Sequence, residues 1–154
     1  MLDWIAALPL ATVLRGSGTA YLAVNAAHIL GIGLLLGSVL PLDLRLAGAF
    51  GRVPLAVVAP FLRGTAMLGA GLAVVTGAAL FSVNPAEYVT NPAFRIKLAL
   101  LALALANAAL AGHPALWRRA MDAGSAPPAL RVLALLSAFL WLSVLLAGRW
   151  IGFL

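Results

Sequence analysis

The chain has 154 residues, of which 64% are hydrophobic and 9% charged, and its mean hydropathy is +1.11. A soluble protein of this length would lack the polar surface needed to cover itself, so we expect an integral membrane protein. The formal net charge is +6, but the basic residues are scattered singly or in pairs, which argues against a nucleic-acid-binding patch. The absence of cysteine excludes disulfides, thiolate metal sites and a cysteine nucleophile.

The first fifteen residues have the pattern of a short amphipathic helix at the membrane interface. They do not resemble a cleaved signal peptide, because the acidic Asp3 stands where a basic region is expected and Pro9 interrupts the apolar stretch. Trp4 and Arg15 would lie at the level of the lipid headgroups.

Four apolar segments follow, each long enough to cross a bilayer. We expect spans over about residues 20–40, 56–82, 94–112 and 130–150. Pro41 would end the first span, Pro60 would kink the second or keep its first turns at the interface, and His113 with Pro114 would end the third.

The segments between the spans, residues 84–92 and 113–128, would be polar connections. The predicted fold is therefore all-α: residues 1–154 form one integral membrane domain, an up-down four-helix bundle with a short N-terminal interfacial helix.

The basic residues between the spans predict the orientation. Six lie on the side of the first and third connections: Arg45, Arg52, Arg63, Arg118, Arg119 and Arg131. Four lie on the other side: Arg15, Arg95, Lys97 and Arg149. The bias favours a multi-pass protein of the bacterial inner (cytoplasmic) membrane with both termini outside. The expected surroundings are lipid, with other membrane subunits or further copies of this chain as candidate partners.

His28 is the first candidate for a functional residue, because an ionisable side chain within a span usually faces a partner, a cavity or a cofactor. Tyr21, Asn25 and Gly31 share its helical face, and Gly31 leaves room for a macrocycle or a neighbouring helix. Three interpretations stay open: a histidine bonded to a neighbouring helix, a cofactor ligand, or a proton-transfer group.

Lys97 could meet His28 within the bundle. Counted from the expected starts of the first and third spans, His28 lies about 10 Å deep and the Lys97 backbone about 4.5 Å deep. The lysine side chain is long enough to reach the histidine level if it turns inward. His113 lies about 28 Å deep and cannot share a site with His28.

Four further features have structural interpretations. Gly33 and Gly37 form a small-xxx-small pair that predicts a close helix contact. We expect Asp43 and Arg45 to form an interfacial ion pair and Asn107 to make an interhelical hydrogen bond. Arg149 beside Trp150 is typical of an anchor at the membrane interface.

Three short runs carry a resemblance to a known family. They are residues 28–31 (His-Ile-Leu-Gly), 43–48 (Asp-Leu-Arg-Leu-Ala-Gly) and 91–98 (Asn-Pro-Ala-Phe-Arg-Ile-Lys-Leu). With these runs the chain resembles a family of small, uncharacterised bacterial four-helix membrane proteins. The layout is more distantly similar to HemJ-type protoporphyrinogen oxidases and to CopD-type copper-resistance membrane domains.

The HemJ-type resemblance implies haem b, since a first-span histidine and a lysine opening a later span are associated with haem there. His28, Lys97 with Leu98, and His113 occupy the matching places. The Arg-x-x-Asn-Glu-x-Pro stretch of those proteins has no counterpart in residues 126–131. This departure weakens the case for protoporphyrinogen oxidation and leaves haem binding open.

The sequence thus predicts a haem-b-binding membrane protein that acts in electron transfer or a related oxidation. His28 would be the first axial ligand and Lys97 a candidate second one. The two would not be equal, because at pH 7 a lysine must first lose a proton from a reference pKa near 10.4, which costs roughly 4.6 kcal/mol. The alternatives are a cofactor-free subunit of a larger membrane complex and a small transporter or copper-import domain.

Overall fold

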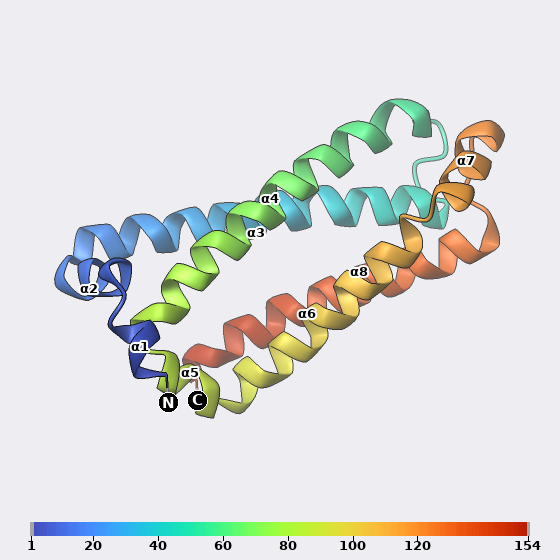
Figure 1. The fold of residues 1–154 in the computed structure, drawn as a ribbon. Helices are drawn as coiled ribbons and strands as arrows, with labels where there is room; N and C mark the ends of the chain where they lie inside the picture. The colour runs from blue at the N-terminus through green and yellow to red at the C-terminus, as the bar shows by residue number, and fades with distance from the viewer. Residues whose placement is uncertain (1, 154) are drawn as a thin grey trace.

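The structure is a computed structural model that describes residues 2–153, and over that range it contains helices and no strands (Figure 1). The elements in chain order are α1 (Asp3–Ala6), α2 (Pro9–Gly16), α3 (Gly18–Ala47), α4 (Leu55–Val83), α5 (Pro85–Thr90), α6 (Pro92–Ala111), α7 (Pro114–Ala123), α8 (Pro128–Trp150) and the 3-10 turn η1 (Ile151–Phe153). The helices α3, α4 and α6, and α8 continued through η1, are long and apolar enough to cross a membrane. The predicted all-α membrane bundle is confirmed.

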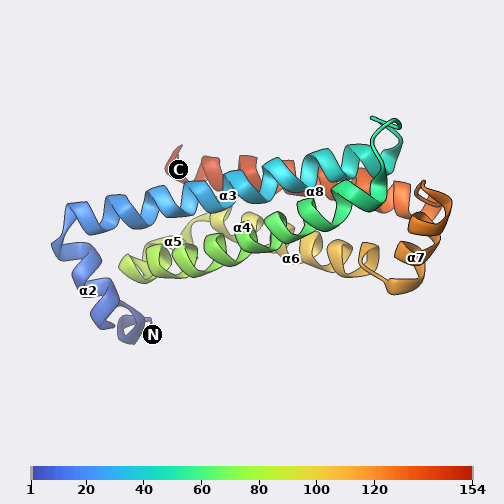
Figure 2. The same ribbon diagram turned by 90° about the horizontal axis from the view of Figure 1, so that it is seen from above.

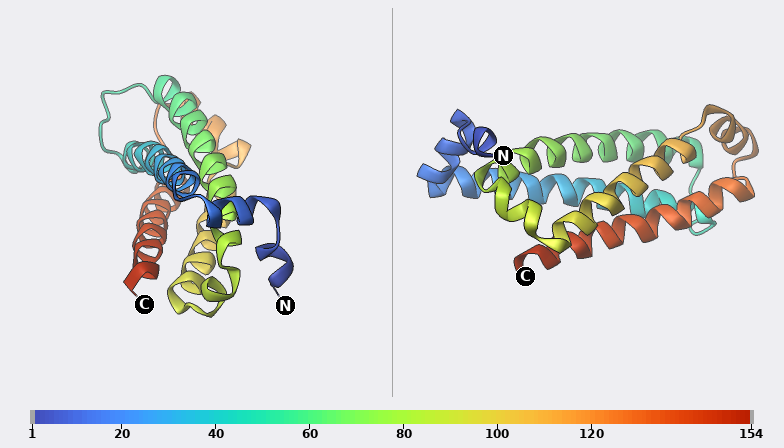
Figure 3. Two further views of the ribbon diagram at one scale, coloured as in Figure 1. Left: turned by 90° about the vertical axis from the view of Figure 1, so that its left-hand side faces the viewer. Right: turned by 60° about the horizontal axis from the view of Figure 1, so that its bottom comes forward.

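The four long helices form two antiparallel pairs, α3 with α4 and α6 with α8, and α3 also packs on α8. Seen from above, they run side by side along the long axis, with α2 at one end and α7 at the other (Figure 2). The helices α3 and α8 lie close together at the α7 end and separate toward the end that carries both termini (Figures 1 and 3). The bundle is therefore a wedge that opens toward the termini.

The α7 end is held by aliphatic packing. Leu42 and Leu46 of α3 pack there with Leu55 of α4 and Leu130 of α8, and the side chains of Leu55 and Leu130 are fully buried. The expected stop of the first span at Pro41 is wrong, because α3 continues through this proline to Ala47. A proline removes one helical hydrogen bond, but continuing the helix brings Leu42 and Leu46 into the aliphatic core.

The expected connections also contain helices. α5 and α7 lie within the two segments predicted as polar loops, and each begins with a proline at its first turn, where no backbone N–H is needed. The expected end of the third span near His113 is confirmed, because α6 ends at Ala111. The helix α4 continues without interruption through Pro60.

The N-terminal segment forms two short helices in place of the single one expected. In α2, Ala11 and Leu14 are buried where this helix packs against α3 and α4. Arg15 donates to the backbone carbonyl of Val83 at 3.0 Å, which ties α2 to the end of α4, while Trp4 stays largely exposed.

The expected ion pair between Asp43 and Arg45 is wrong. Residues two apart on a helix do not face each other, and here they serve different neighbours. The Arg45 guanidinium donates to the carbonyls of Val53, at 2.8 Å, and Gly124, while Asp43 contacts Ser137 of α8. Arg45 therefore closes the connection between α3 and α4.

The interhelical bond expected of Asn107 is confirmed. Its side-chain amide donates to the carbonyl of Leu133 in α8 at 3.0 Å, and Asn107 is buried. This bond fixes the register of α6 against α8 near the α7 end of the bundle.

The helices α3 and α4 approach each other closely at Gly31 and Gly69. A Cβ atom on Gly31 would lie 2.7 Å from the Ala73 backbone nitrogen, and one on Gly69 would lie 2.5 Å from that of Leu35. The predicted contact at Gly33 and Gly37 is wrong, since a Cβ atom on either would meet nothing within 4 Å. A helix that is hydrophobic all round does not show from its sequence which face meets a neighbour.

This contact predicts which glycines the bundle requires. We expect Gly31→Ala and Gly69→Ala to lower the free energy of unfolding in detergent by about 1–3 kcal/mol each, because the added methyl group forces the two backbones apart. Gly33→Ala and Gly37→Ala are the matched controls and should leave stability within about 0.5 kcal/mol of the parent protein. Equal tolerance at Gly31 and Gly33 would contradict the α3–α4 packing.

Candidate cofactor site

A large, mainly apolar cavity of about 860 Å³ lies between the two helix pairs. One wall comes from α3 and α4 and the other from α6 and α8, with Val89 of α5 at the termini end. Along α3 the lining runs from Asn25 to Leu36, a helical rise of about 16 Å. The wedge shape of the bundle is what leaves this space.

His28 and Lys97 both line this cavity. The sequence predicts that these two residues can meet, because their depths along the first and third spans are compatible. His28 belongs to the α3–α4 wall and Lys97 to the α6–α8 wall. Both side chains are partly buried. His113 lies elsewhere, at the start of α7, where its Nδ1 accepts from the Ala115 backbone N–H at 3.3 Å.

The imidazole of His28 is held by α4. Its Nδ1 lies 3.0 Å from the hydroxyl oxygen of Thr76, and its ring lies over Gly77, where a Cβ atom would be 3.0 Å from Cε1. The interpretation of His28 as a histidine bonded to a neighbouring helix is therefore confirmed for one of its two nitrogens.

The Thr76 hydroxyl fixes the tautomer of His28. Its single proton goes to the carbonyl of Leu72, 2.6 Å away, so its oxygen must accept from the histidine. Nδ1 then carries the imidazole proton and Nε2 keeps its lone pair. The ring also hydrogen-bonds to the Ala73 backbone carbonyl, which in this tautomer can accept only from Nδ1–H, and no side chain within residues 2–153 bonds to Nε2. A neutral imidazole oriented through its other nitrogen is the usual form of a metal-ligating histidine.

Lys97 lies against the opposite wall. Its Cδ and Cε atoms would be 3.4 Å from a Cβ atom on Gly148, so the absence of a side chain at Gly148 lets the lysine cross the face of α8. Arg149, the next residue of α8, also lines the cavity. The sequence suggests only an interfacial anchor for Arg149, because nothing in its local pattern shows that this end of α8 faces a cavity.

Aromatic rings close the termini end of the cavity. Phe81 of α4 stacks on Phe94 of α6 with ring centroids 5.5 Å apart, and both line the cavity. Tyr88 of α5 packs against both rings, at 6.0 Å and 5.4 Å. Trp141, which is 5% exposed, lines the cavity from α8. Flat apolar walls of this kind suit a flat ligand.

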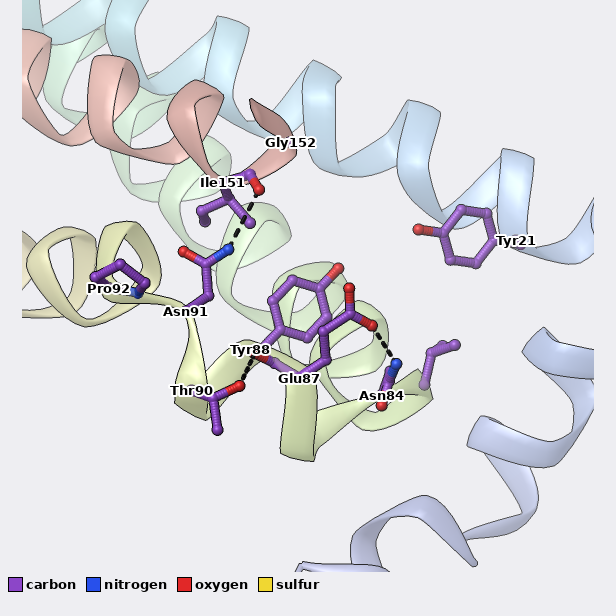
Figure 4. A pocket seen from close by; sticks show the side chains of 10 residues that line it. Tyr21, Asn84, Glu87, Tyr88, Thr90, Asn91, Pro92, Ile151 and Gly152 are labelled. Atoms are coloured by element: carbon purple, nitrogen blue, oxygen red, sulfur yellow. Dashed lines mark hydrogen bonds between the residues drawn. The ribbon is translucent and has the colours of Figure 1, made fainter. Parts of the chain in front are cut away.

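The other residues predicted for the site lie in three different places. Asn25 lines the cavity, but Gly31 does not, because the backbone of α4 occupies the space beside it. Tyr21 lies at a second, polar pocket of about 620 Å³ formed with α5 and η1 (Figure 4). Glu87 and Tyr88 face that pocket, and burial raises the pKa of Tyr88.

Sequence reasoning missed the side chains that support His28. Thr76 and Gly77 lie in an apolar run of α4 and become significant only once α3 is placed beside them. In the part of the chain that the structure describes, no group of three His, Cys, Asp or Glu residues lies close enough to hold a metal ion by itself. An iron bound here would have to bring most of its own ligands, as a porphyrin does.

The tautomer of His28 is a testable feature of the protein without any cofactor. We expect ¹⁵N NMR of the imidazole to show an Nδ1–H tautomer in the parent protein and in Thr76→Ser, and a larger Nε2–H fraction in Thr76→Val, which keeps the volume but loses the hydroxyl. His113→Gln leaves His28 as the only histidine and removes ambiguity of assignment. A dominant Nε2–H tautomer in the parent protein would contradict the assignment.

Comparison with known proteins gives a family and no function. No curated protein and no solved structure matches the chain, so the likeness to HemJ-type and CopD-type proteins gains no support. One family model matches the whole sequence, residues 1–154, and its description is "Family of unknown function (DUF6644)". The chain therefore belongs to this family of unknown function.

Proposed function

We propose that the protein binds haem b in the cavity between the two helix pairs and acts in electron transfer or a related oxidation at the bacterial inner membrane. The observation that carries the proposal is His28: Thr76 holds Nδ1–H, which leaves Nε2 free as a ligand at a large apolar cavity. A neutral imidazole binds iron at pH 7 with little proton cost, because its reference pKa is near 6.5.

The cavity fits the group in three respects. Its volume of about 860 Å³ lies within the range of roughly 300–1,000 Å³ that is usual for cofactor sites. Phe81, Phe94 and Trp141 supply flat apolar contacts. Lys97 and Arg149 supply positive charge, which suits a ligand that carries carboxylates.

When bound, haem would supply one-electron chemistry at its iron. The chain's own residues would bind and orient it: Thr76 fixes the His28 ring, Gly77 makes room for that ring, and the apolar walls keep water away. Lys97 as a second axial ligand stays a prediction from the sequence.

The experiment is an absorption spectrum of protein purified from a haem-supplied host. We expect a Soret band in the parent protein and its loss in His28→Ala, because no other described residue offers the same free imidazole at the cavity. His113→Ala is the matched control and should keep the band, since this residue caps α7.

Circular dichroism and gel filtration would show that both histidine variants remain folded. A colourless parent protein after reconstitution with haem, or an unchanged spectrum in His28→Ala, would remove the haem proposal. A cofactor-free subunit of a larger membrane complex would then be the leading interpretation.

The proposed orientation, with both termini outside, has a separate test that uses the absence of native cysteine. Ser17 precedes α3 and Ser125 precedes α8, at opposite ends of the bundle (Figure 2). In intact spheroplasts, an impermeant thiol reagent should label Ser17→Cys and spare Ser125→Cys, and permeabilised cells should show labelling of both. The reverse pattern in intact spheroplasts would show that both termini lie inside.

A further inference from the structure

The cavity holds basic side chains without acidic ones. His28, Lys97 and Arg149 line it, and within residues 2–153 no Asp or Glu does so. The Lys97 ammonium has no hydrogen-bond or ion-pair partner among the described residues. Because an unpaired cation in an apolar span is costly, this arrangement favours a ligand that brings its own negative charge.

The level of the Lys97 ammonium follows from two interhelical bonds. Asn107 of α6 bonds to Leu133 of α8, and Asn91 at the start of α6 bonds to Ile151 at 3.3 Å. With this antiparallel register the Lys97 backbone lies level with α8 residues near 143–145. Its Nζ would nevertheless lie 3.5 Å from a Cβ atom on Gly148, about 6 Å nearer the termini end.

Lys97 therefore runs toward the membrane surface, as long basic side chains in spans usually do. His28 lies at a deeper level, because it contacts Gly77, one turn below the stacked pair of Phe81 and Phe94. The imidazole and the ammonium thus occupy different depths of one cavity. A group bound at His28 would meet the ammonium at its surface-facing edge.

Arg149 is the second cation near the outer end of the cavity. It follows Gly148 directly, lines the same cavity, and its guanidinium lies 5.3 Å from the ring centroid of Phe153. A guanidinium presents paired N–H donors that match a carboxylate. The cavity thus has one free imidazole nitrogen at depth and two cations near its outer end.

We propose that Lys97 and Arg149 bind the two carboxylates of haem, with Lys97 kept as an ammonium, in place of iron ligation by Lys97. The proposal rests on the haem-binding function proposed above. Two cations match two carboxylates, and their position lets the charged edge of the ligand stay near the lipid headgroups while its apolar body lies between the aromatic walls.

The test compares haem b with haem dimethyl ester, in which both carboxylates are blocked, by titration into detergent-solubilised apoprotein. We expect the parent protein to bind the ester at least about tenfold more weakly than haem. Lys97→Leu and Arg149→Gln should each weaken haem binding about tenfold and have little effect on binding of the ester.

Two controls separate charge from shape and from iron ligation. Lys97→Arg should restore the affinity for haem, and Arg95→Gln, which removes an exposed charge of α6 outside the cavity, should have no effect. The spin state of the bound iron should be the same in the parent protein, Lys97→Leu and Lys97→Arg.

The titrations and the spin state distinguish a failure of this inference from a failure of the proposed haem binding. A change of spin state in both Lys97→Leu and Lys97→Arg would show that Lys97 ligates the iron and would overturn the inference. Equal affinity of the parent protein for haem and its ester would overturn it as well, and would assign the two cations to lipid headgroups. A parent protein that binds neither compound would refute haem binding itself.

Discussion

The close approach of α3 and α4 at Gly31 and Gly69 is the contact on which the site depends. The two backbones lie so near each other that neither glycine can carry a side chain. This approach brings His28, one turn before Gly31, against Thr76 and Gly77, one turn beyond Ala73. If the helices were spaced by ordinary side chains, Thr76 could not hold Nδ1 at 3.0 Å. The tautomer that leaves Nε2 free is thus a consequence of backbone packing.

Three polar side chains within the spans are stabilised in three different ways. His28 bonds to a hydroxyl that has already given its own proton to a helix carbonyl, and Asn107 bonds to the backbone of α8. Lys97 has no such partner and crosses Gly148 toward the termini end of the bundle. In two of the three cases a glycine on the neighbouring helix provides the space. Small residues in these spans therefore position polar groups as well as bringing helices together.

The sequence predicts the spans well and the contacts poorly, for one physical reason. Length and hydropathy define a span whatever its neighbours are, and depth along parallel spans was enough to pair His28 with Lys97 and to separate His113. Which face of a span meets a neighbour depends on tertiary packing that an all-apolar helix does not encode in its periodicity. This is why the sequence favours Gly33 and Gly37 for a contact that Gly31 makes, and why it does not assign Thr76, Gly148 and Arg149 to the cavity.

The two ends of the bundle have different physical roles. The α7 end carries large aliphatic side chains packed to full burial at Leu55 and Leu130, and Arg45 ties its connections together. The termini end, where α3 and α8 separate, holds a cavity bounded by aromatic rings. Where the cavity lies, the facing side chains of the two helix pairs lack packing partners, and such a gap loses dispersion contacts. A ligand that fills the cavity would add the missing contacts and stabilise the folded state by its binding free energy, which links occupancy of the site to the stability of the termini end.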